Sequence, residues 1–278
     1  MTTTSEVLTV ESAGDVATLW LDRPAKRNAM GPAFWSDLPA MMGELGDDPG
    51  VRAVVVAGRG AHFSAGIDLA MLASDELAGG GSDARHRSPA SVAGSTLRAV
   101  RHMQRAFDAV ARCPKPVIAA IWGSCIGGGV DLIASCDIRI AAADAVFSLR
   151  ETKMAIVADL GSLQRLPRII GQGHLAELAF TGKDVDAARA KEIGLVNGVF
   201  ADAEAAAAAA HGLAREIAAC SPLAVQGTKA VLAAADEDAV AQGLRYVAAW
   251  NAAFIRSDDL TEAVEARLEN RPARFTGR

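Results

Sequence analysis

Two short apolar runs in the sequence each end in a glycine-rich turn that leads into a helical pattern. The first run, RAVVVA at residues 52–57, continues as GRGAHFSAGIDLAML, and the second, PVIAAIWG at residues 116–123, continues as SCIGGGVDL. A continuous apolar run of this length between turn residues is typical of a strand buried on both faces. Strands that alternate with helices in this way predict parallel β-α-β units with helices on the faces of the sheet.

The other segments predict how the chain is organised around this core. Residues 7–21 alternate apolar and β-branched positions around a Gly-Asp turn, which predicts a hairpin. A helix is predicted over residues 32–45, and residues 74–95 have the composition of a surface loop before a helix that starts at Thr96. From His174 to Arg267 nearly every segment has an alanine-rich helical pattern. We therefore predict an α/β core over residues 1–200 and a helical region over residues 201–278.

Charge and residue usage argue against several functional classes. The net charge of −5 provides no global positive field, so we expect no nucleic-acid partner and no membrane partner. The four cysteines and five histidines lack zinc-ligand spacing, which predicts that no metal is bound. Residues 1–20 lack the features of a secretory signal, and no apolar run approaches the ~20 residues that span a bilayer. We therefore expect a cytoplasmic protein.

The two glycine-rich turns are candidate sites for binding an oxyanion. Bends at residues 64–66 and 127–129 leave backbone N–H groups unpaired at helix N-termini, where the helix dipole also favours negative charge. If the fold brings the turns together, two N–H groups can bind one developing oxyanion, and losing such a donor costs roughly 3 to 4 kcal/mol of transition-state stabilisation. The alternative is that the glycines only allow a helix to pack closely on a strand.

Three of the carboxylates that follow the second turn are candidates for proton chemistry. They are Asp131, Glu151 and Asp159. Buried carboxylates are rare unless they are paired, hydrogen-bonded or used, so three in one segment suggest proton chemistry. Each also has a structural explanation: Asp131 in the first turn of a helix, Glu151 in an ion pair with Arg150 or Lys153, and Asp159 as a helix cap or turn residue.

With these residues in view, the chain resembles the crotonase (enoyl-CoA hydratase/isomerase) superfamily from about Val7 onward. The matching blocks are RPAKRNAM, HFSAGIDL, KPVIAAIWGSCIGGGVDL, SCDIRIAA and QRLP at residues 164–167. The resemblance implies an α/β fold built as a ClpP-like spiral of repeated ββα units. It also implies that residues 201–278 form a helical trimerisation region and that the protein is a homotrimer or a homohexamer.

The resemblance also implies the substrate and the residues that bind it. The substrate is an acyl-CoA thioester whose carbonyl oxygen accepts hydrogen bonds from the N–H groups of Ala65 and Gly128. No cofactor is implied, because coenzyme A is part of the substrate. The basic run that contains Arg23, Lys26 and Arg27 is the expected nucleotide contact, and residues 74–95 would border the acyl pocket. The residues expected to bind substrate are Lys26, Gly66, Ile67, Asp68 and Leu69.

The acids point to one branch of the superfamily. Enoyl-CoA hydratases have a glutamate at position 131 and a glycine-containing stretch at positions 158 and 159, whereas this chain has Asp131 and Asp159. In this respect it resembles the Δ3,5-Δ2,4-dienoyl-CoA isomerases of fatty-acid β-oxidation. The resemblance makes Glu151 and Asp159 a proton-transfer pair and Asp131 a necessary third acid.

The predicted reaction moves two conjugated double bonds by one position. One carboxylate takes a proton from C2, a dienolate forms, and the other carboxyl group delivers a proton to C6. We expect Asp159 to act at C2 and Glu151 at C6. Two alternatives remain: an enoyl-CoA hydratase that holds a water between two acids, and a coenzyme A-binding protein of the same fold without catalytic activity.

Overall fold

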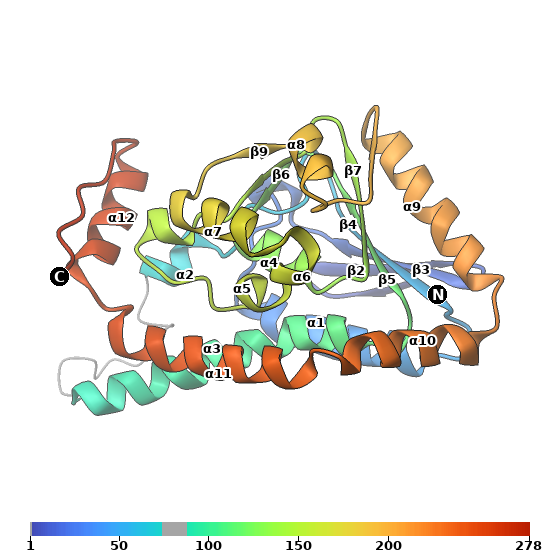
Figure 1. The fold of residues 1–278 in the computed structure, drawn as a ribbon, viewed down its shortest axis with the longest axis horizontal. Helices are drawn as coiled ribbons and strands as arrows, with labels where there is room; N and C mark the ends of the chain where they lie inside the picture. Colours follow the sequence, from blue (N-terminus) through green and yellow to red (C-terminus); the bar gives the residue numbers. More distant parts are fainter. Residues whose placement is uncertain (1, 74–87) are drawn as a thin grey trace.

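A computed structural model describes residues 2–73 and 88–278. Its centre is a seven-stranded sheet with the strand order β1-β2-β3-β4-β5-β7-β10 (Figure 1). The strands of this sheet are β1 (Thr2–Thr4), β2 (Leu8–Ala13), β3 (Val16–Leu21), β4 (Ala53–Gly58), β5 (Val117–Ile121), β7 (Ile138–Ala142) and β10 (Gly198–Phe200). A smaller sheet joins β6 (Ser124–Ile126), β8 (Val146–Ser148) and β9 (Val185–Asp186).

The predicted hairpin and the predicted buried strands are confirmed. β2 and β3 pair antiparallel around Gly14, whose φ of 61° is readily adopted by glycine. From β3 through β4, β5 and β7 to β10 the neighbours are parallel, with Val55 opposite Ile118 where β4 meets β5. Every residue of β4 and β5 is buried, as the two apolar runs predict.

The two faces of the sheet are covered differently because alternate residues of each strand point to opposite sides. On one face lies α9 (Ala203–Ala218), which contacts β4, β5 and β7. The buried positions of α9 are alanines spaced four apart, so small side chains let the helix lie close to the sheet: Ala206, Ala210, Ala214 and Ala218. The opposite face packs against the main core, which includes the buried side chains of α1 (Pro32–Asp47) and α3 (Pro89–Arg112).

The start of α3 corrects one prediction. Residues 88–95 were expected to belong to a surface loop, but α3 begins at Pro89, with the Ser88 hydroxyl accepting a bond from the Ser91 N–H at 3.2 Å. Proline at the first helical position after a serine cap is a strong start signal that the Gly- and Ser-rich composition obscured. The rest of the expected loop, residues 74–87, lies outside the described residues, as does its predicted place beside the acyl pocket.

Short helices lie in the connections between the strands. They are η1 (Pro24–Lys26), α2 (Leu69–Ala73), α4 (Gly128–Ala134), η4 (Glu151–Met154), α5 (Ser162–Arg165), α6 (Pro167–Ile170), α7 (Gln172–Thr181) and α8 (Ala187–Glu192). Both glycine-rich turns lie beside β6 of the smaller sheet. Ser64, before the first turn, forms an isolated bridge to Cys125 in β6, which brings the two predicted turns side by side.

Three further helices complete the chain: α10 (Pro222–Ala234), α11 (Glu237–Phe254) and α12 (Asp258–Leu268). α11 packs along α3, so residues from the C-terminal part of the chain reach the core (Figure 1). Among the described residues, no single helix is long and apolar enough to cross a membrane; α9 and α10 meet that criterion only as a pair, bent by 110°.

Candidate active site

The second glycine-rich turn opens α4. Gly127 has a φ of 52° and donates its N–H to the Ser148 carbonyl at 2.9 Å. A side chain here would place Cβ 3.2 Å from Oε1 of Glu151, so the turn leaves space against that carboxyl group. Gly128 is the first residue of α4, and its N–H has no hydrogen-bond partner within residues 2–73 and 88–278.

The first glycine-rich turn is held by hydrogen bonds on one side. The Met30 N–H donates to the Gly66 carbonyl at 2.8 Å, and the Asp68 N–H donates to the Met30 carbonyl at 3.0 Å. In an extended segment successive N–H groups point to opposite sides. The N–H of Ile67, between these two bonds, therefore points away from Met30, and no described residue accepts a hydrogen bond from it.

The pair of free N–H groups is not the predicted one. Ala65 donates its N–H to the Arg27 carbonyl at 2.9 Å, so this donor is already used and the prediction for Ala65 is corrected. Ile67 replaces it: a Cβ placed on Gly128 would lie 3.7 Å from the Ile67 nitrogen. Among the described residues, the N–H groups of Ile67 and Gly128 are thus two donors without a partner where the turns meet. Which side each N–H faces depends on the pairing with Met30, which the sequence does not reveal.

A buried asparagine holds the loop before α1 against the first turn. Asn28 has a φ of 55°, and its amide donates to the carbonyls of Arg59 at 3.0 Å and His62 at 2.8 Å, while the Ser64 hydroxyl donates to the Asn28 carbonyl. Sequence reasoning missed this residue. The signal available was an asparagine in a basic loop, since asparagine tolerates the left-handed region better than most residues.

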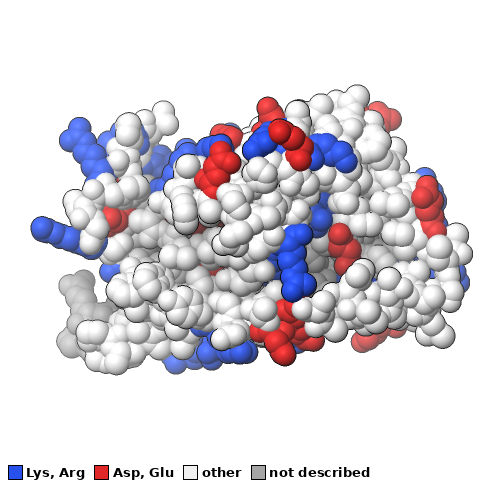
Figure 2. Space-filling model, in the orientation of Figure 1, with Lys and Arg blue, Asp and Glu red and all other residues white. Residues whose placement is uncertain are grey.

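The basic run is divided between internal and surface roles. Arg23 donates to the Ala29 carbonyl at 2.7 Å and pairs with Asp68 at 3.3 Å, so it stabilises the loop. Lys26 and Arg27 are exposed. On the face shown in Figure 2, basic and acidic side chains of the described residues are scattered among uncharged ones and form no continuous basic field.

Asp131 is buried in the first turn of α4. The Ser162 N–H donates to Oδ1 of Asp131 at 2.6 Å, which ties α4 to the start of α5. Burial raises the pKa of Asp131 to about 6, against the opposing effects of the Ser162 hydrogen bonds and the charge of Arg165. The carboxylate thus receives its bond from another element, so its role is not limited to capping its own helix.

Asp159 lies in the segment before α5 and is 7% exposed. It does not cap α5, because the N-cap of that helix is Gly161. The Asn251 amide donates to Oδ2 of Asp159 at 2.7 Å, and the Gln104 amide donates to the Asp159 carbonyl at 2.8 Å. Burial raises the pKa of Asp159 to about 7, with the Asn251 bond acting against the rise and the Asp131 charge adding to it.

Glu151 begins η4, and its Oε2 is buried without a hydrogen-bond partner among the described residues. It is not paired with Arg150, which binds Asp184 at 2.6 Å instead. Burial raises the pKa of Glu151 to about 8, and the charges of Asp131 and Asp159 raise it further in the same direction. A carboxyl group without a donor and beside two other acids favours the protonated form at neutral pH.

The three acids come from separate elements and interact through their charges, and Oε1 of Glu151 adjoins the second turn at Gly127. Asp131 and Asp159 each accept a hydrogen bond at the carboxyl group, whereas Oε2 of Glu151 accepts none from the described residues. Different environments of this kind allow one carboxyl group to act as the base and another as the acid. Within the described part of the chain, no three His, Cys, Asp or Glu side chains are grouped so that they could hold a metal ion.

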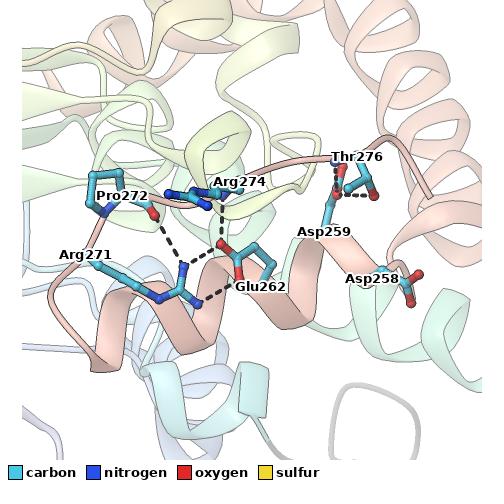
Figure 3. A pocket seen from close by; sticks show the side chains of 7 residues that line it. All are labelled: Asp258, Asp259, Glu262, Arg271, Pro272, Arg274 and Thr276. Carbon is cyan, nitrogen blue, oxygen red and sulfur yellow. Dashed lines mark hydrogen bonds and ion pairs between the residues drawn. The ribbon is translucent and has the colours of Figure 1, made fainter.

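Away from the three acids, a pocket lies between α12 and residues 271–276 (Figure 3). Two of its acids are hydrogen-bonded: both oxygens of Glu262 bind Arg271, and Asp259 accepts bonds from the N–H groups of Thr276 and Gly277. None of the three acids described above lines it. This pocket is therefore separate from the candidate active site.

Known proteins that resemble this chain share its family and its fold. A family model described as Enoyl-CoA hydratase/isomerase matches residues 11–278. The chain belongs to this family. Among solved structures, an enoyl-CoA hydratase/isomerase from Mycobacterium paratuberculosis has a TM-score of 0.81 and 31% identity, covering 94% of this chain and 98% of that one. An enoyl-CoA hydratase from Mycobacterium avium subsp. paratuberculosis K-10 has a TM-score of 0.82 at 23% identity, covering 97% and 98%. The predicted crotonase fold is confirmed.

Relatives within the enoyl-CoA hydratase/isomerase family narrow the resemblance. The chain is 43% identical to the peroxisomal Delta(3,5)-Delta(2,4)-dienoyl-CoA isomerase of Arabidopsis thaliana, over 98% of this chain and 96% of that protein. It is 44% identical to the mitochondrial dienoyl-CoA isomerase of Homo sapiens, over 90% and 75%, and 42% identical to that of Dictyostelium discoideum, over 94% and 87%. The predicted resemblance to this branch is confirmed.

The same relatives correct the predicted location. A cytoplasmic protein was expected, but these relatives are named peroxisomal in Arabidopsis thaliana and mitochondrial in Homo sapiens and Dictyostelium discoideum. The expectation was wrong because it used the lack of a recognised targeting pattern as evidence for a compartment, and such a lack identifies none.

Proposed function

We propose that this chain is a Δ3,5-Δ2,4-dienoyl-CoA isomerase of fatty-acid metabolism. The observation that carries the proposal is the buried pair of acids with different environments, Asp159 with an amide donor and Glu151 with none. Relatives with this name match the chain at 42–44% identity over 90% or more of its length. One ionised and one protonated carboxyl group are what a proton transfer between two carbons requires.

The mechanism is two proton transfers through an enolate. Asp159 takes the proton from C2, and the electrons of that C–H bond pass into the thioester, whose oxygen becomes negative while the double bonds remain conjugated. Glu151 then gives its proton to C6. The electrons return, the carbonyl is restored, and the double bonds lie at C2 and C4. Atoms and charge balance without another reactant, and the return of a proton from Asp159 to Glu151 resets the site.

The negative oxygen of the enolate is bound by the N–H groups of Ile67 and Gly128. Both donors belong to rigid turns and have no competing partner among the described residues, so no reorganisation is needed when charge develops. Asp131 remains a necessary neighbour, because its charge raises the pKa of both Glu151 and Asp159. Because the three acids interact, the protonation of each depends on the charges of the other two.

A direct assay separates this function from its alternatives. A 3,5-dienoyl-CoA substrate is expected to give the absorbance change of a conjugated 2,4-dienoyl-CoA, with turnover well above the hydration of crotonyl-CoA. Hydration of crotonyl-CoA at a comparable rate would favour an enoyl-CoA hydratase. Binding of coenzyme A without turnover of any dienoyl-CoA or enoyl-CoA would favour a non-catalytic protein.

Substrate binding uses the surface next to the first turn. The exposed Lys26 and Arg27 stand beside this turn, because the Arg27 carbonyl accepts the Ala65 N–H. We assign Lys26 to the nucleotide phosphates, and residues 66–69 to the thioester end. Lys26→Ala is expected to raise KM for the acyl-CoA several-fold with kcat unchanged, whereas Lys183→Ala, which removes a surface pair with Glu177, changes neither. An unchanged KM in Lys26→Ala would contradict this assignment.

The C-terminal helices provide an apolar surface for assembly as a homotrimer or a homohexamer. α10 has no buried residue, and large apolar side chains of α10 and α11 are exposed: Leu223, Val231, Leu232, Tyr246, Trp250 and Phe254. An apolar surface of this extent is typical of a protein interface. Light scattering is expected to give three or six times the chain mass of 28.7 kDa, and a single chain mass at micromolar concentration would exclude both assemblies.

A further inference from the structure

One polar side chain of α11 reaches the candidate acids from the C-terminal part of the chain. Asn251 is 1% exposed, and the other buried residues of α11 are apolar: Leu244, Val247 and Ala248. Its Nδ2 lies 2.7 Å from Oδ2 of Asp159 and 2.8 Å from the carbonyl oxygen of Val157. A buried amide on an apolar helix face requires partners, and both of these belong to the segment that holds Asp159.

The contact with Val157 fixes which way the Asn251 amide points. A backbone carbonyl only accepts hydrogen bonds, so the Asn251 atom that faces it is the nitrogen. Nδ2 has two hydrogens, and one goes to each partner. Oδ2 of Asp159 is therefore an acceptor in this contact, and a donor directed at a carboxyl oxygen favours the ionised form of the group.

The second acid of the proton-transfer pair has no such donor. Oε2 of Glu151 is buried without a partner among the described residues, although Oε1 adjoins the turn at Gly127. A hydrogen bond donated to a carboxylate favours its ionised form, and the lack of a donor in a buried place favours the neutral form. The difference between the two acids is thus located in one side chain of α11.

The charged groups around Asp159 do not make this distinction by themselves. The charge of Asp131 in α4 acts against ionisation of Asp159, and the charges of Asp131 and Asp159 act against ionisation of Glu151 in η4. Arg165 of α5 pairs with Asp108 of α3 at 2.6 Å. Gln104 of α3, whose amide is the other donor to Asp159, binds its backbone carbonyl and not its carboxyl group.

We propose that Asn251 is a positioning residue that selects Asp159 as the ionised base and leaves the proton on Glu151. The inference rests on the proposed function and adds the residue that sets the direction of proton transfer, from C2 to Asp159 and from Glu151 to C6. It also explains how the site resets, because the Asn251 donor favours ionised Asp159 while Oε2 of Glu151 has no donor among the described residues, so a proton returns to Glu151 after each turnover.

The test replaces Asn251 and follows activity against pH. Asn251→Leu keeps a similar volume without a donor, and Asn251→Asp keeps the shape and adds a negative charge. In both, the pKa of Asp159 rises, so the acidic limb of the kcat/KM profile moves to higher pH by about one unit or more, a tenfold loss well below the limb. The alkaline limb, set by Glu151, moves little, and the active pH range narrows.

A matched control separates this effect from added charge or lost stability. Asn197→Asp adds the same charge at an exposed position and keeps the oxygen that accepts the Arg139 N–H, so neither limb is expected to move. If the Asn251 variants lose activity equally at every pH, with an unmoved acidic limb, the residue is merely structural and the proposal is overturned. Asn251→Asp, which preserves shape, provides the measurement if Asn251→Leu does not fold.

A titration without substrate distinguishes failure of this inference from failure of the proposed function. Carbon-13 NMR of labelled aspartate carboxyl groups, assigned with Asp159→Asn, gives the midpoint of Asp159 directly. We expect a higher midpoint in both Asn251 variants, even if no dienoyl-CoA is turned over. An unchanged midpoint overturns the role of Asn251, whatever the substrate is.

Discussion

Replacing Asp159 with asparagine is expected to lower kcat for a 3,5-dienoyl-CoA by roughly 10² to 10⁴-fold, the contribution usual for a positioned acid or base. An amide at this position cannot take the proton from C2. Its oxygen can still accept the bond from the Asn251 amide, now 2.7 Å from Oδ2, so the local structure is retained. The measurement is the absorbance of the conjugated product, with circular dichroism to confirm the fold.

Two further variants make this result specific. Asp184→Asn alters a carboxylate that pairs with Arg150 at the surface and is expected to retain activity. Glu151→Gln removes the acid and is expected to lower kcat by a similar factor.

In the unmodified chain, activity is expected to fall below about pH 7, as Asp159 gains a proton, and above about pH 8, as Glu151 loses its proton. In Glu151→Gln, the decrease in activity above about pH 8 is expected to disappear. Turnover unchanged in Asp159→Asn would eliminate Asp159 as the base.

Local patterns in the sequence were sufficient for the core and for the acids. RAVVVA and PVIAAIWG are apolar throughout because β4 and β5 are buried on both faces, and the glycine-rich turns follow them directly. Asp131, Glu151 and Asp159 lie within one stretch of 29 residues that also contains Asp137 and Asp144, and the resemblance to the crotonase superfamily singles out the three. The structural alternatives fail because, among the described residues, Glu151 forms an ion pair with neither Arg150 nor Lys153, and because Gly161, not Asp159, is the N-cap of α5.

Contacts between distant segments could not be predicted in the same way. Asn251 is separated from Asp159 by 92 positions, and only the packing of α11 along α3 brings it to the acids. The choice of Ile67 over Ala65 as a free N–H depends on hydrogen bonds with Met30 and Arg27. Ala65 and Ile67 lie two positions apart, where alternation alone would place both N–H groups on the same side, so only the distant Arg27 carbonyl distinguishes them, and a resemblance of motifs does not settle the donor.

The glycine that separates these two residues is expected to be indispensable. Gly66 has a φ of 88°, and a Cβ added to it would lie 2.6 Å from the Ile126 carbonyl oxygen and 3.3 Å from the Gly128 nitrogen. Both contacts are with backbone, which cannot rotate away as a side chain can. In Gly66→Ala the two turns must therefore separate, and the Ile67 and Gly128 N–H groups no longer converge on one oxygen.

We expect Gly66→Ala to lower kcat by roughly 10² to 10³-fold, as for the loss of one oxyanion donor, and to reduce the free energy of unfolding by more than the ~1 to 2 kcal/mol due to φ alone. Gly14→Ala is the matched control, because Gly14 has a φ of 61° and no atom within 4 Å of the added Cβ. Gly14→Ala thus measures the loss of unfolding free energy due to a positive φ alone, without a steric clash, and should keep full activity. Denaturant unfolding and single-turnover kinetics measure the two effects. Equal stability and equal activity in the two variants would mean that the turns tolerate separation, and that the enolate oxygen is not held between Ile67 and Gly128.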